Sequence, residues 1–88
     1  MNVYDKASWH IDEGQDEKEV LTRFSLIFSY LNENAMLTDD GKEIFELGID
    51  DSVVIHEGML TESGNAFMND RYDSLLTLSL DELKETLK

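Results

Sequence analysis

The chain has 88 residues, no cysteine, and 20 acidic against 7 basic residues, which gives a formal net charge of −13 at pH 7. This length predicts one domain, and the lack of cysteine excludes disulfides, thiolate catalysis and metal sites built on cysteine. Because the acidic residues are spread along the chain, its surface should repel phosphates and anionic lipids, so direct contact with nucleic acid or a membrane is disfavoured.

Residues 1–15 mix apolar and polar side chains and close near Gly14, which predicts an N-terminal arm packed on the body. Trp9 is interpreted as a packing anchor of this arm rather than as a platform for a ligand. The arm holds no apolar run that could act as a signal peptide, and no later run could span a membrane. The expected location is therefore the cytoplasm.

A long central helix is predicted at about 17–33, with Asp16 as its N-cap. Apolar residues at helical spacing cover an arc of roughly 220° around this helix. Such an arc is too wide for a simple surface helix, which buries only one side. Two readings remain open: a helix covered from several sides within one chain, or a homodimer formed through the Val20–Leu31 helix.

A repeated phrase follows: MLTDDGKEIF at 36–45 returns as MLTESGNAFM at 59–68. Thr38 and Thr61 are predicted N-caps, and the acidic residues after them suit the first turn of a helix. These roles do not explain glycine at the third helical position of both copies, where it costs about 1 kcal/mol relative to alanine. We expect Gly41 and Gly64 to allow close packing against a neighbouring backbone.

The repeat does not fit a ligand loop. Aligning either glycine with the sixth position of a calcium-binding EF-hand puts methionine at the first ligand position, and a single glycine per copy among acids is no phosphate loop. The pattern LTxxGxxF resembles the phrase that follows the wing in winged-helix regulators. That resemblance implies a degenerate winged-helix scaffold used for protein contacts, with 49–58 as an acidic wing, since no helix carries enough Lys or Arg to bind DNA.

The rest of the chain predicts further short elements. Gly48 should stop the helix that begins after the first repeat, which takes Ile44, Phe45 and Leu47 as its apolar face. Residues at about 52–56 form a possible short extended segment, and Ser79 should cap a last helix. The predicted fold is a mainly α, compact domain of four to five helices over 16–88.

His10 and His56 are the only histidines, and each lies beside acidic residues in the sequence. A small metal-dependent domain that uses both is one alternative, although surface histidines with local hydrogen bonds are commoner. No nucleophile motif is visible, so we expect neither enzymatic activity nor a cofactor.

The main functional hypothesis is a small intracellular interaction module, acting as an inhibitor, an immunity-like protein or an adaptor, that binds a basic partner protein. Its candidate binding surface is acidic and consists of Asp39, Asp40, Glu43, Glu46, Asp50 and Asp51.

Overall fold

The structure is a computed structural model that describes residues 3–87. Its elements, in chain order, are the strand β1 (Val3–Lys6), the helices α1 (Ala7–Asp12), α2 (Glu17–Glu33) and α3 (Asp39–Leu47), the strand β2 (Val54–His56), the 3-10 turn η1 (Glu57–Met59), and the helices α4 (Glu62–Leu76) and α5 (Leu80–Thr86). The mainly α single-domain prediction is confirmed, including the bounds of the central helix. The possible extended segment at about 52–56 contains the shorter strand β2.

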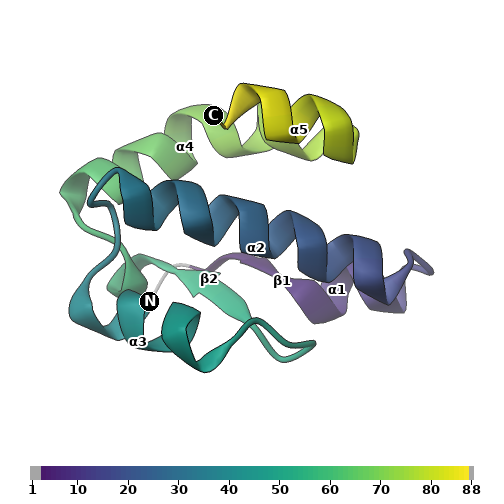
Figure 1. Cartoon of the computed structure of the whole chain (residues 1–88), viewed down its shortest axis with the longest axis horizontal. Helices are drawn as coiled ribbons and strands as arrows, with labels where there is room; N and C mark the ends of the chain where they lie inside the picture. Colours follow the sequence, from purple (N-terminus) through teal and green to yellow (C-terminus); the bar gives the residue numbers. More distant parts are fainter. Residues whose placement is uncertain (1–2, 88) are drawn as a thin grey trace.

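The central helix α2 lies between two layers (Figure 1). Helices α4 and α5 pack on one side of it, and the small sheet with α1 and α3 lies on the other. The buried residues of α2 are Val20, Phe24, Ile27, Phe28 and Leu31. The centre of the wide apolar arc is therefore covered within one chain, and Leu21, Leu26 and Tyr30 at its margins are partly buried against the same core. A homodimer through the Val20–Leu31 helix, the other open reading, is not needed to explain the burial of these five side chains.

The N-terminal segment is part of the fold rather than an arm laid against it. Strand β1 pairs antiparallel with β2, with Asp5 opposite Ile55, and Ala7 at the start of α1 is fully buried. Trp9 does not anchor this segment, as its side chain is 47% exposed with the Lys6 ammonium 5.5 Å from the ring centroid. The prediction for Trp9 was wrong because the packing of the neighbouring elements, and not the local sequence, decides which face of so short a helix is buried.

All four predicted caps lie at helix N-termini. The side chains of Asp16, Thr38, Thr61 and Ser79 each accept a hydrogen bond from the backbone N–H three residues ahead. At α5 the bond is reciprocal, because Glu82 also accepts from the Ser79 N–H at 3.0 Å. These bonds satisfy donors that a helix start would otherwise leave free, so local sequence fixes where each helix begins.

The two copies of the repeat pair with each other. Leu37 and Leu60 form an isolated antiparallel bridge. The Thr38 N–H donates to the Met59 carbonyl, and the Thr61 N–H donates to the Met36 carbonyl, both at 2.9 Å. The starts of α3 and α4 are thus joined by a pseudo-symmetric contact.

The glycines make room for that contact. A Cβ added to Gly41 would lie 2.4 Å from the Met59 carbonyl oxygen, and one added to Gly64 would lie 2.4 Å from that of Met36. Both distances are far inside van der Waals contact. Each helix start is packed against the backbone of the other copy, at the two positions where the sequence had no local reason for glycine.

Candidate protein-binding surface

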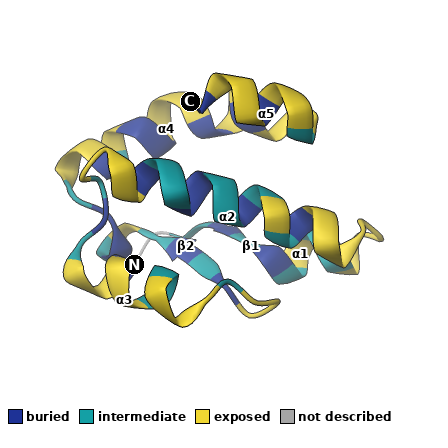
Figure 2. Ribbon diagram, in the orientation of Figure 1, coloured by how far each residue is buried: buried dark blue, intermediate teal, exposed yellow. Residues whose placement is uncertain are grey.

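The acidic face is defined here as the six residues that the sequence singled out on and after α3. All six are exposed, and Figure 2 shows the outer side of α3 as a largely exposed surface. Its members are Asp39, Asp40, Glu43, Glu46, Asp50 and Asp51. Helical spacing puts the first four on the side of α3 that faces away from Gly41, the buried residue of that helix. The structure therefore gathers four of these charges on one accessible side of α3, and the exposed Asp50 and Asp51 follow in the segment after the helix.

No salt bridge to these carboxylates forms within the described part of the chain, where the one close contact between a basic and an acidic side chain joins His10 to Asp5. Lys42 is the only basic residue between positions 38 and 52. Hydrogen bonds from the Ser52 hydroxyl and backbone N–H hold the pKa of Asp50 below its ordinary value, so this carboxylate stays charged at neutral pH. The face presents a concentrated negative potential to solvent.

An apolar groove lies beside the acidic face. Its volume is about 280 Å³, and its lining joins the end of α3 to β2 and η1 through Ile44, Leu47, Val54 and Met59. Leu47 is 80% exposed. It was predicted on the apolar face of its helix, but its angular position puts it among the acids, and the chain leaves the helix at the next residue, Gly48.

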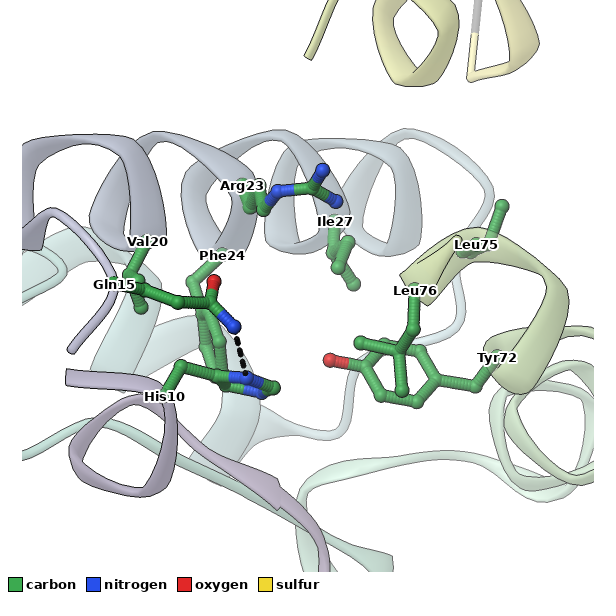
Figure 3. A pocket seen from close by; sticks show the side chains of 9 residues that line it. All are labelled: His10, Gln15, Val20, Arg23, Phe24, Ile27, Tyr72, Leu75 and Leu76. Atoms are coloured by element: carbon green, nitrogen blue, oxygen red, sulfur yellow. Dashed lines mark hydrogen bonds between the residues drawn. The ribbon is translucent and has the colours of Figure 1, made fainter. Parts of the chain in front are cut away.

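A second, smaller hollow of about 90 Å³ lies between α1, α2 and α4 (Figure 3). Phe24 and Ile27 of α2 lie between His10 on one side and Tyr72 on the other, and Arg23 lies above them in this view. The Arg23 guanidinium donates to the Leu78 carbonyl, which ties α2 to the segment between α4 and α5. This hydrogen bond and the apolar walls give the hollow a structural role in joining three helices.

A buried carboxylate lies behind that hollow. Asp5 is 3% exposed and accepts hydrogen bonds from the Tyr72 hydroxyl at 2.5 Å and from the Lys6 N–H at 2.8 Å. The His10 Nε2 contacts both carboxylate oxygens of Asp5, Oδ1 at 2.9 Å and Oδ2 at 2.7 Å. Burial, followed by the charge of Asp5, raises the pKa of Tyr72. Sequence reasoning missed this group, because Asp5 reads as an ordinary polar residue until β1 is placed inside the core.

The two histidines take part in different local interactions. His10 lines the smaller hollow, whereas His56 lines the groove and accepts from the Gly58 N–H through its Nδ1 at 3.1 Å. No three His, Cys, Asp or Glu side chains among residues 3–87 gather closely enough to hold a metal ion. The geometry gives no support to the metal-site alternative.

The segment that would be an acidic wing, 49–58, does not fold back on itself as a hairpin. Its strand β2 pairs instead with β1 from the N-terminus. Among the described helices, none is long and apolar enough to cross a membrane. No family matches the chain, and neither a curated protein nor a solved structure shows significant similarity to it.

Proposed function

We propose that the protein is an intracellular, non-enzymatic interaction module that binds a basic partner protein through the acidic face. The observation that carries this proposal is the set of six exposed carboxylates with no ion-pair partner in the described part of the chain. A surface of this kind is costly in self-repulsion and gains most when a cationic surface covers it.

The proposed role is to occupy and block a basic surface, as an inhibitor, an immunity-like protein or an adaptor would. Long-range attraction to the acidic face would speed association, and salt would weaken that attraction over a Debye length of about 10 Å at 0.1 M. The uncompensated charge and the neighbouring apolar groove support binding rather than catalysis, which requires a pocket that shifts the pKa values of reacting groups.

The test compares two variants with equal changes in net charge. The face variant carries Asp39→Asn, Asp40→Asn, Glu43→Gln and Glu46→Gln. The control variant carries Glu62→Gln, Asp70→Asn, Asp73→Asn and Asp81→Asn, at exposed positions on α4 and α5. Partners captured by wild-type protein from cells of its source would be identified, purified and titrated against all three proteins.

The expected partner is basic, its affinity falls with salt, and the face variant binds at least about tenfold more weakly. The control variant should stay close to wild type. If both variants bind the partner equally weakly, binding depends on net charge alone and not on the acidic face. Salt-insensitive binding, or a set of exclusively acidic partners, would contradict the proposal.

A further inference from the structure

The outer edge of β2 is open. In the described part of the chain β2 has one sheet neighbour, β1. The Ala7 N–H donates to the Val53 carbonyl, so Val53 faces β1. Because backbone groups of an antiparallel strand alternate between its two edges, the N–H and carbonyl of Val54 point away from β1. Among residues 3–87, no hydrogen bond reaches the N–H or the carbonyl of Val54 from this outer side.

That open edge borders the apolar groove. Val54 and the strongly exposed Leu47, at the end of α3, both belong to the lining of the groove. An unpaired strand edge offers main-chain hydrogen bonds to an incoming chain, and an adjacent hollow offers a place for one of its side chains. The two features together suit an extended segment better than a helix, which has no free backbone groups to pair with Val54.

The charge around the groove selects the occupant. Asp50 is part of the lining, and Asp51 and Glu46 are exposed close by in the chain. A second copy of this protein would bring the same negative charge to the contact and be repelled. A cationic segment would be attracted, with its apolar residues directed at Leu47 and its charged residues at the acidic rim.

We propose that the groove takes an extended, positively charged segment of the partner protein, which pairs with Val54 as an added strand and buries an apolar side chain against Leu47. This inference rests on the proposed function, since it names how a basic partner would be held next to the acidic face. The partner is a polypeptide that alternates basic and apolar residues over a short stretch.

The test uses a short capped peptide in which lysine and valine alternate. Its binding is measured by the changes in the backbone amide NMR signals of the protein. Two analogues carry N-methyl groups, one on every valine nitrogen and the other on every lysine nitrogen. An added strand uses one of its own edges, so one analogue should lose at least about tenfold in affinity while the other binds like the parent. The Val54 amide should gain protection from hydrogen exchange.

A peptide of lysine and glycine separates the two proposals, because it keeps the charge and lacks the apolar side chains. Leu47→Ser should weaken binding of the lysine–valine peptide and leave binding of the lysine–glycine peptide unchanged. Because Leu47 is strongly exposed, this variant should still fold. If both N-methyl analogues bind like the parent, strand addition is overturned and the charge-based function stands. If neither lysine peptide shifts signals of the acidic face at low salt, both proposals are overturned.

Discussion

The carbonyl oxygens of Met36 and Met59 explain the two glycines of the repeat. Each oxygen accepts a hydrogen bond from the opposite threonine N–H and lies where a side chain at Gly41 or Gly64 would begin. The sequence indicated that something unusual happens at these positions, because helix capping accounts for threonine and acid but not for glycine. It could not indicate that the two copies face each other.

Gly41→Ala and Gly64→Ala should each destabilise the fold. The added methyl group meets a backbone oxygen that is held by its own hydrogen bond, so the helix start must shift. We expect a loss of about 1–3 kcal/mol in the free energy of unfolding despite the better helix propensity of alanine. Urea titration of each variant measures it. Asn69→Ala, at an exposed position of α4, is the control, and a glycine variant as stable as this control would refute the packing explanation.

The contact between Tyr72 and Asp5 makes stability depend on pH. Burial and the neighbouring carboxylate raise the pKa of Tyr72 in the folded state above the ordinary value near 10. The folded protein therefore holds this proton more tightly than the unfolded chain, and the contribution to stability is present below pH 10 and lost above it.

Tyr72→Phe should remove that alkaline loss. We expect the variant to be less stable at neutral pH by about 1–3 kcal/mol, because buried Asp5 loses a donor. Between about pH 9 and 11 its stability should fall less than that of wild type. Urea titrations across this range compare the two slopes, and Tyr4 and Tyr30, present in both proteins, cancel in the difference. Parallel curves would show that the hydroxyl does not carry the effect.

At the scale of elements, the sequence predicted correctly those helix boundaries that local interactions determine. The bounds of α2 follow from a cap at Asp16 and from a long periodic pattern, and the capping box at Ser79 marks α5 in the same way. Strand β1 was missed, because it exists only through pairing with β2, which lies beyond three helices in the chain. The groove could not be predicted either, because its lining joins the end of α3 to β2 and η1.

Because β1 and α1 complete the core, removing residues 1–12 should abolish cooperative folding. The deletion takes away the sheet partner of β2, the fully buried Ala7, and the cover over Ile55. Far-UV circular dichroism with thermal unfolding would show a broad, weak transition. Trp9→Ser, which changes a half-exposed side chain of α1, should stay within about 1 kcal/mol of wild type. A truncated protein that still unfolds sharply would mean that the segment is a dispensable arm.

Ser79→Ala tests the last helix. The substitution removes one of the two bonds of the capping box and should cost about 1 kcal/mol of stability. Without this bond α5 should open locally more often, which uncovers the buried Leu83 and Leu87. Hydrogen exchange should therefore speed up across α5 while the rest of the protein stays closed. Thr86→Ala, whose hydroxyl bonds only to the Glu82 carbonyl in its own helix, is the matched control. Equal exchange in both variants would argue against the role of the cap.

At the scale of the whole molecule, a net charge of −13 on 88 residues opposes the compact state through self-repulsion. No salt bridge between a lysine or arginine and an acidic side chain forms among residues 3–87, so this repulsion is not relieved by close pairing there. The same excess of negative charge that favours a basic partner should make the stability of the isolated protein depend on ionic strength.

Raising sodium chloride from about 0.01 to 0.15 M, which shortens the screening length from about 30 to 8 Å, should increase the melting temperature. A gain of about 1 kcal/mol would correspond to about 4–8 °C for a domain of this size. The face and control variants, each with four charges fewer, should show a smaller gain. An uncharged osmolyte at equal osmolarity separates screening from exclusion effects, and a melting temperature independent of salt would contradict the expectation.

The reciprocal contact at the repeat also has a kinetic consequence. The start of α3 is completed by a carbonyl that belongs to the segment before α4, and the start of α4 is completed by one before α3. Neither start can reach its native hydrogen bonds until the other has arrived, so both should form in a single event whose cost is the closure of the loop between them. Alanine at Gly41 and at Gly64 should then slow folding in the same proportion to the stability each removes, giving matched φ-values at two sites in different helices.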